Sequence, residues 1–441
     1  MAHECRRLLW AGLIVVLCTR PLAAADAVLD GVLARLERLE AENVKLREEV
    51  TQLKARLDGT AAAPASAPVE ERLAVAEQRI EEQQQTKVES EQHVPVKLKG
   101  MVLFNAYMSG RNGTPQDFPT VATANRGAAA IRGTMRNSSI GLEVQSPYHV
   151  AGAEARGEIM LDFYGNFEEF STPRIRTGFV DLQWPSTGLR FGIEKPIVAP
   201  RNPSSLAQFI YPALWGTGNL WLWQPQVRVE QKFHFGGNDL RVQAGLLQTN
   251  DQRALNPASP IVLQPRPAWE GRIAWSRKRD DDHAVEFAPG FHYSRTLVQG
   301  TSLPSQLVTA DWRIAPARAW EITGAMFTGR NAGPIGGIRQ GIVAVPAGGF
   351  RSVGTTGGWS QLMYRPVDRL RFHAMAGTQD DRSRDLNRGN INRNFSWILN
   401  SMYQLGPNVV VGLEMQQIRT DYLGLPTRVL NRYDLALGYI F

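Results

Sequence analysis

The last nine residues of the chain alternate between two kinds of side chain. Because successive side chains of a β-strand point to opposite faces, this alternation predicts a strand with one apolar face and one small or polar face. A strand of this kind that ends the chain on an aromatic residue is typical of a β-barrel with a lipid-facing exterior. A buried strand of a soluble protein is the alternative. We predict that the apolar positions also form the signal for the barrel assembly machinery. They are Tyr433, Leu435, Leu437, Tyr439 and Phe441, and Asp434, Ala436 and Gly438 lie between them.

Residues 1–25 have the features of a secretory signal peptide. A basic pair precedes an apolar run over residues 8–17, and an Ala-Ala-Ala sequence ends at residue 25. A lipid anchor on Cys18 is the alternative, although the bulky Leu17 stands where a small residue is expected. Both cysteines, Cys5 and Cys18, lie in this segment, so the mature chain is expected to lack thiols, disulfides and cysteine-ligated metals.

Beyond residue 25 no apolar run reaches the roughly 18 residues that a transmembrane helix needs. An exported chain without such a helix is either soluble in the periplasm or a membrane barrel. Strand alternation averages out in hydropathy windows, so the mean hydropathy of −0.26 is compatible with both.

Residues 26–58 repeat apolar side chains with a heptad period, which predicts an α-helical coiled coil of about four heptads. Opposite charges flank its apolar positions, which favours parallel chains. The run from Arg35 to Glu40 resembles a short trimerisation motif, which favours three strands over two. The predicted oligomerisation residues are Leu36, Leu39, Asn43, Leu46, Val50 and Leu53, of which Asn43 either fixes the register or is a tolerated polar defect. The coil could also act as a spacer, or as a tether to peptidoglycan or periplasmic proteins.

Residues 59–94 connect the coil to the rest of the chain. Their first part is a linker rich in Ala and Pro, which should decouple the segments on either side. Their second part is a short helical connector that is either a second coil or a solvated helix.

Residues 95–441 contain strands with one apolar and one polar face. Seven short turns alternate with eight longer polar stretches, which predicts a barrel of about sixteen antiparallel strands. An even count places both barrel ends in the periplasm, where the coil must be. The turns are at 146–152, 185–188, 235–239, 278–282, 316–319, 366–369 and 406–408. The loops are at 109–135, 165–173, 195–225, 248–267, 295–305, 328–356, 377–393 and 418–427. Tryptophans at 184, 269, 275, 312, 320, 359 and 397 lie near strand ends or on outward faces, as interfacial girdles require.

The barrel segment carries the positive charge of the chain. The total is +7, the signal peptide contributes +2 and residues 26–94 contribute −6, which leaves +11 for the barrel. Basic side chains in phase with the polar faces predict a pore that attracts anions. The pore-lining candidates are Arg156, Arg190, Lys195, Arg201, Arg228, Arg241, Arg272 and Arg313. Pairing with interior acids such as Glu158, Glu230, Glu270 and Asp311 is the alternative for each of them.

The stretch from Lys195 to Leu220, which follows the fifth predicted strand, is rich in Pro, Gly and aromatic residues. The third loop of sixteen-stranded porins commonly folds into the lumen as a constriction. Lys195 and Arg201 are therefore candidates for the narrowest part of the pore. An ordinary outer loop is the alternative.

Five local sequences stand out in the first half of the barrel: Val96–Gly100, Ser138–Leu142, Glu158–Gly165, Pro173–Phe179 and Pro225–Glu230. Together with the order of signal, coil, linker and barrel, they resemble the DcaP-like trimeric porins of Gram-negative outer membranes. The resemblance implies a homotrimer with one channel per subunit, and uptake of dicarboxylates and related small organic anions. Family members often have His-Ala-Tyr where this chain has Thr177-Gly178-Phe179, so its selectivity could differ. Phosphate-selective porins have a similar layout, which leaves the choice of anion open.

We expect no enzyme activity, no cofactor and no metal. The mature chain has six histidines, at 93, 149, 234, 283, 292 and 373, and no spacing arranges them with an acid and a nucleophile. A trimeric adhesin is disfavoured because one chain has enough strands for a whole barrel. The sequence predicts a passive outer-membrane porin for small anions, surrounded by lipid and lipopolysaccharide and without a nucleic-acid partner. An envelope tether anchored by the barrel is the alternative.

Overall fold

The structure is a computed structural model and describes residues 95–441 except 114–116, 126, 166–170, 249–261, 264–265, 281, 338–339 and 347. The predicted signal peptide, coiled coil and linker, residues 1–94, lie outside the described residues. So do the predicted oligomerisation residues, which stay predictions.

The described residues contain twenty strands and two single-turn 3-10 helices. The strands are β1 (Val96–Ser109), β2 (Ala130–Thr134), β3 (Ser139–Val150), β4 (Ala153–Asp162), β5 (Arg174–Gln183), β6 (Thr187–Glu194), β7 (Gln224–Phe235), β8 (Asn238–Leu247), β9 (Val262–Leu263), β10 (Ala268–Lys278), β11 (Ala284–Val298), β12 (Thr301–Ala317), β13 (Trp320–Arg330), β14 (Ile342–Ala344), β15 (Phe350–Ser352), β16 (Gly354–Val367), β17 (Leu370–Asp381), β18 (Ile391–Gln404), β19 (Val409–Tyr422) and β20 (Arg428–Ile440). The 3-10 helices are η2 (Gly333–Ile335) and η3 (Ser383–Asp385). Among the described residues, no helix is both long and apolar enough to cross a membrane.

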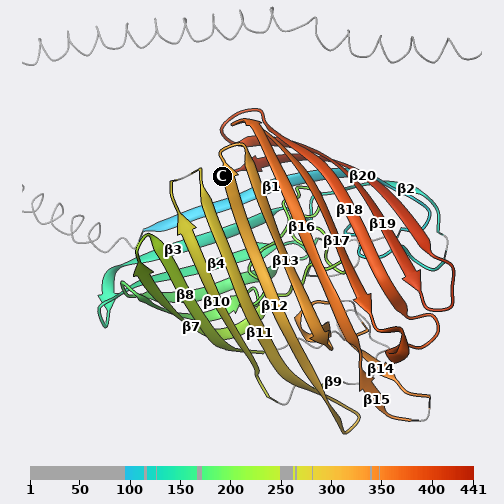
Figure 1. The fold of residues 1–441 in the computed structure, drawn as a ribbon. Coiled ribbons are helices and arrows are strands. Elements are labelled where there is room, and N and C mark those ends of the chain that lie inside the picture. The colour runs from blue at the N-terminus through green and yellow to red at the C-terminus, as the bar shows by residue number, and fades with distance from the viewer. Residues whose placement is uncertain are drawn as a thin grey trace, which may run out of the picture. The chain divides into compact units, whose positions relative to one another are not determined.

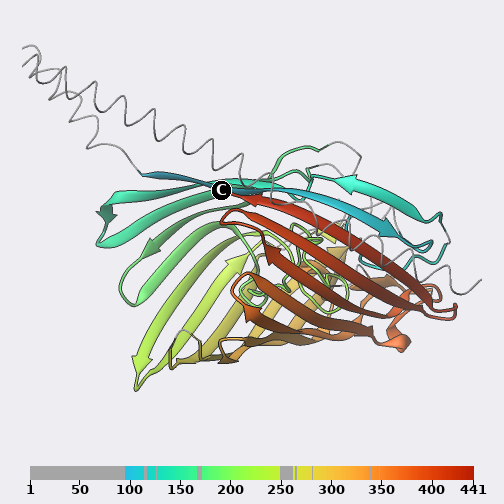
Figure 2. The same ribbon diagram turned by 90° about the horizontal axis from the view of Figure 1, so that it is seen from above.

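The strands form one closed antiparallel barrel (Figures 1 and 2). The last strand, β20, returns to pair with β1, from Met101 opposite Ile440 to Ser109 opposite Arg432. Two positions in the barrel are shared by two strands each. β2 and β3 both pair with β1, and β9 and β10 both pair with β11. The eighteen described strands of this sheet therefore occupy sixteen positions, which confirms the predicted count.

The alternation in the sequence sets which side chains face outward. On β20, Tyr433 and Leu435 are each 45% exposed, whereas Asp434 and Ala436 beside them are only 6% and 2% exposed. Leu437, Tyr439 and Phe441 are also exposed. The five residues of the predicted assembly signal thus share the outer surface, and their role in assembly stays a prediction.

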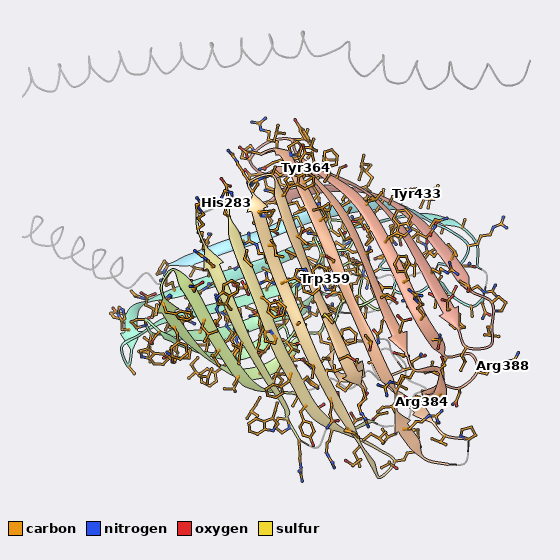
Figure 3. All side chains as sticks on the ribbon, in the orientation of Figure 1. His283, Trp359, Tyr364, Arg384, Arg388 and Tyr433 are labelled. Atoms are coloured by element: carbon orange, nitrogen blue, oxygen red, sulfur yellow. The ribbon has the colours of Figure 1, made fainter. Side chains whose placement is uncertain are left out.

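All seven predicted short turns are present. They lie at 151–152, 184–186, 236–237, 279–283, 318–319, 368–369 and 405–408. The C-terminus lies at the same end of the barrel, together with His283 and Tyr364, whereas Arg384 and Arg388 mark the opposite, loop end (Figures 1 and 3). Most connections at the loop end are longer than those at the turn end, as is common in outer-membrane barrels.

One predicted long loop, 295–305, is wrong. β11 and β12 continue as a hairpin to a two-residue turn at Gln299 and Gly300, both with positive φ (46° and 83°), as this kind of turn requires. The polar side chains of this stretch belong to strands, because hydrogen bonds between β11 and β12 satisfy the backbone N–H and C=O groups as far as Val298 and Thr301.

The prediction that Trp359 faces outward or lies near a strand end is also wrong. Trp359 is 3% exposed in the middle of β16 and packs with Ala213 and Leu214. An apolar side chain can face the lumen here because a loop inside the barrel covers it. Trp269 and Trp320 are 59% and 41% exposed, as an outer girdle requires.

Candidate functional site

The connection between β6 and β7, residues 195–223, lies inside the barrel, and we call it the inner loop. It hydrogen-bonds to strands on many sides of the lumen. Two bonds run from the wall to the loop: Asn105 of β1 donates to the carbonyl of Leu206 at 3.1 Å, and Asn400 of β18 donates to the carbonyl of Ser204 at 2.8 Å. Two run from the loop to the wall: Arg201 donates to Asp311 of β12 at 2.8 Å, and Gln208 donates to Glu414 of β19 at 3.1 Å. These contacts rule out an ordinary outer loop. The inner loop narrows the lumen, as predicted for the third loop.

Glycines allow the inner loop to approach the wall closely. Gly218 has φ 105°, and a Cβ there would lie 2.2 Å from the carbonyl oxygen of Gly358 on β16 and 2.6 Å from that of Thr378 on β17. Any side chain at position 218 would therefore push the loop away from these two strands.

We expect Gly218→Ala to alter the size and stability of the channel current. Gly389 provides a matched control, because it has φ 86° and an added Cβ would meet nothing within 4 Å. Alanine in the left-handed region costs about 1–2 kcal/mol at either position, but only Gly218→Ala must also move the inner loop. Single-channel recording should show altered conductance or larger fluctuations in Gly218→Ala alone. Equal behaviour of the two variants would contradict this packing.

A polar cavity of about 460 Å³ opens on the inner wall of the barrel. Strands β5 to β8, β10 and β11 form its wall, and Pro200 and Arg201 of the inner loop close one side. Its lining also includes Gly188 of β6, next to the turn at 184–186, so the cavity extends toward the turn end. The complete lining is Asp181, Gln183, Gly188, Arg190, Pro200, Arg201, Arg228, Glu230, Lys232, Arg241, Gln243, Arg272 and Glu286.

Cations outnumber carboxylates around this cavity. Six lining residues are arginine or lysine and three are aspartate or glutamate, which gives the lining a formal charge of +3. Asp311 and Glu194, which pair with lining arginines from outside the cavity, are not part of this count. A concave site with a low-dielectric wall concentrates the field of such charges.

Two of the arginines are held by a buried ion-pair network. Arg272, with a side chain only 3% exposed, donates to both carboxylate oxygens of Asp311 at 2.8 Å and to Glu286 at 2.8 Å. Arg201 of the inner loop donates to the same two acids, at 2.8 Å and 2.7 Å. Their charges are therefore largely neutralised, and the network ties the inner loop to β12.

Arg228 differs from these residues because it has no ion pair with a described residue. It lies directly opposite Arg190 in the register of β6 and β7. Arg190 is paired with Asp181 at 2.9 Å and Glu194 at 3.0 Å, and its guanidinium lies 4.0 Å from the centre of the Phe179 ring. Like charges directly opposite on neighbouring strands repel, so an anion that binds at Arg228 would relieve this repulsion.

A third group of cations shares one acid. Glu230 lies 3.4 Å from Lys232 and 3.9 Å from Arg241, and it also accepts from Gln243 at 2.7 Å. The side chain of Arg241 is 47% exposed. Two cations with one loosely placed carboxylate between them leave donors that a solute can reach.

The cavity brings together five of the eight predicted pore-lining residues, namely Arg190, Arg201, Arg228, Arg241 and Arg272. The other three lie elsewhere. Arg156 pairs with Glu143 and Glu158, and Arg313 pairs with Glu321. Lys195 begins the inner loop, and burial lowers its pKa. The sequence reading missed Lys232, although it follows Arg228 and Glu230 at the same two-residue spacing on β7.

Comparison with solved structures identifies the architecture. No family model matches the chain, and no curated protein matches its sequence. The structure is similar to the outer-membrane channel DcaP of Acinetobacter baumannii, with a TM-score of 0.67 and 16% identity over 79% of this chain and 97% of that one. The barrel has the porin fold.

Two further porins are similar. An anion-selective porin from Comamonas acidovorans has a TM-score of 0.55 and 11% identity, over 79% of this chain and all of that one. OprB of Pseudomonas putida has a TM-score of 0.50 and 10% identity, over 78% of this chain and 94% of that one. The resemblance to DcaP-like porins noted from the sequence thus extends to the fold.

Proposed function

We propose that this porin is a passive channel of the bacterial outer membrane that admits small anionic solutes. The observation that carries the proposal is the cavity below the inner loop, with six cations, three carboxylates and an arginine that has no ion pair with a described residue. Solutes would enter at the loop end, bind briefly to the free cations and leave at the turn end without energy input.

The outer surface of the barrel supports the membrane location. Large apolar side chains from strands all around the barrel are exposed, among them Val102, Phe191, Phe233, Val308 and Leu413. In water these side chains would be a large apolar surface, whereas lipid would cover them. We also propose that three copies assemble through the coiled coil at 26–58, and that lipopolysaccharide surrounds the barrel.

Dicarboxylates are the solutes that the arrangement of charges favours. The cations of the cavity that lie outside the Asp311 network fall into two groups. Arg228 lies beside the paired Arg190, and Lys232 and Arg241 share Glu230. We propose that a dicarboxylate places one carboxylate at each group, because arginine binds carboxylates with two parallel hydrogen bonds. Phosphate or other small anions would use the same donors, one group at a time.

The proposal is tested by the zero-current potential of the purified protein in a planar bilayer under a potassium chloride gradient. We expect a potential whose sign shows preference for chloride over potassium, and a concentration-dependent reduction of the current by succinate. A cation-preferring channel would refute the proposal, and so would a barrel that conducts no ions. If phosphate reduces the current at lower concentrations than succinate does, phosphate is the preferred solute instead.

A further inference from the structure

A second group of cations lies in the lumen outside the cavity. Arg176 is the third residue of β5, close to the loop end, and is 8% exposed. Lys195 follows the last residue of β6 and begins the inner loop. Trp223 ends that loop. The guanidinium carbon of Arg176 lies 5.1 Å from the centre of the Trp223 ring, and Lys195 Nζ lies 5.9 Å from the same centre.

Neither cation has a carboxylate partner among the described residues. Arg176 donates to the carbonyl of Phe209 at 3.3 Å. Lys195 donates to the carbonyl of Pro200 at 3.5 Å and, with the Asn202 amide in its hydrogen-bonded orientation, to the side-chain oxygen of Asn202 at 3.2 Å. The nearby acids are engaged elsewhere. Asp162 forms an ion pair with Arg174 at 2.8 Å, and Glu194 forms one with Arg190 at 3.0 Å.

Arg176 also lies 4.9 Å from the centre of the Phe209 ring. Aromatic rings attract cations only weakly, and the two like charges beside Trp223 repel each other. Burial lowers the pKa of Lys195, the charge of Glu194 opposes this effect, and the charge of Arg176 adds to it. Arg176 is buried and has no ion pair with a described residue, which is costly, so a counter-ion would stabilise this group.

The neighbouring indoles point to the same conclusion. Trp221 and Trp223 lie edge to face, with ring centres 5.7 Å apart. Both indole N–H groups are buried and have no acceptor among the described residues. Buried donors are normally satisfied, and the ring that carries the unsatisfied Trp223 donor is the one beside both cations, which favours a missing acceptor there.

We propose that Arg176, Lys195 and the indole N–H of Trp223 form a second anion site, which binds an oxyanion such as sulfate, phosphate or a carboxylate. This inference builds on the proposed function. The guanidinium fork and the ammonium suit an ion with several acceptor oxygens. Because Arg176 is close to the loop end of β5 and Asp181 of the cavity is close to the turn end, this site lies nearer to the loop end than the cavity does.

Sulfate block of the potassium chloride current tests the site. With sulfate added at the loop end, we expect Arg176→Gln combined with Lys195→Gln to raise the half-blocking concentration at least about tenfold, as loss of a charge-assisted contact predicts. The preference for chloride should remain because the cavity is unchanged. Arg176→Lys keeps the charge and should retain most of the block.

Arg156→Gln is the matched control for the single variant Lys195→Gln, because each removes one lumenal charge, but Arg156 already lies between two glutamates. It should leave the sulfate block unchanged. Heat-dependent migration on gels would show that each variant is folded. If the double variant does not fold, the single variant Lys195→Gln replaces it in the sulfate-block measurement. An unchanged block in a folded double variant would overturn the second site and leave the proposed function intact. A wild-type channel that prefers cations would instead overturn the proposed function.

Discussion

Replacing Arg228 and Arg241 by glutamate is expected to reverse the ion preference of the channel. The two substitutions change the formal charge of the cavity lining from +3 to −1 without touching the buried network around Asp311. Because charged clefts change local ion concentrations by a factor of about ten or more, the permeability ratio of chloride to potassium should fall at least about tenfold. The sign of the zero-current potential under a salt gradient measures the change.

The matched control places the same change of charge outside the lumen. Arg384 and Arg388 are exposed at the loop end of the barrel (Figure 3). Their double replacement by glutamate lowers the net charge equally, but solvent and salt screen these positions. If both double variants shift the potential equally, the selectivity comes from the overall charge and not from the cavity.

Asp311→Asn is expected to cause a large loss of stability. Asp311 has a side chain only 2% exposed and accepts from both Arg201 and Arg272. Without its charge, Glu286 alone must balance two largely buried guanidinium groups. Removing one partner from a buried ion pair costs about 3 kcal/mol or more. Urea unfolding of the barrel in lipid vesicles, followed by tryptophan fluorescence, measures the loss.

Asp368→Asn is the control for this effect. Asp368 accepts from Arg318 at 2.8 Å, but the two side chains are 71% and 64% exposed. An exposed pair contributes less than about 1 kcal/mol, so this variant should unfold close to the wild type. Equal destabilisation in the two variants would show that burial of the Asp311 network does not matter. Because Arg201 anchors the inner loop through Asp311, Asp311→Asn should also increase the fluctuations of the channel current.

The Arg228 and Arg241 double variant and Asp311→Asn together separate two roles of arginine in one pore. Arg201 and Arg272 lie in the cavity but are neutralised by acids, so they mainly hold the inner loop in place. Arg228 has no ion pair with a described residue and Arg241 is only loosely paired, so we expect these two arginines to contact an anion in the cavity. A count of basic residues in the sequence does not distinguish these roles, because the distinction depends on which acids the fold brings close.

The sequence by itself determined the barrel, its sixteen strands and its seven turns. This was possible because the two-residue period of a strand and the chemistry of tight turns are local properties. It also located the inner loop, whose composition differs from that of the neighbouring strands. The hairpin turn at Gln299 and Gly300 was missed because its polar flanks look like a loop, although they are paired in the ladder.

Only the tertiary structure decided which charges meet. Arg201 and Asp311 are 110 positions apart, and their contact depends on the closure of the barrel and on the path of the inner loop across it. The opposition of Arg190 and Arg228 depends on the register of two strands, and the inward position of Trp359 depends on the loop that covers it. These features arise from long-range packing, so no local pattern of residues contains them.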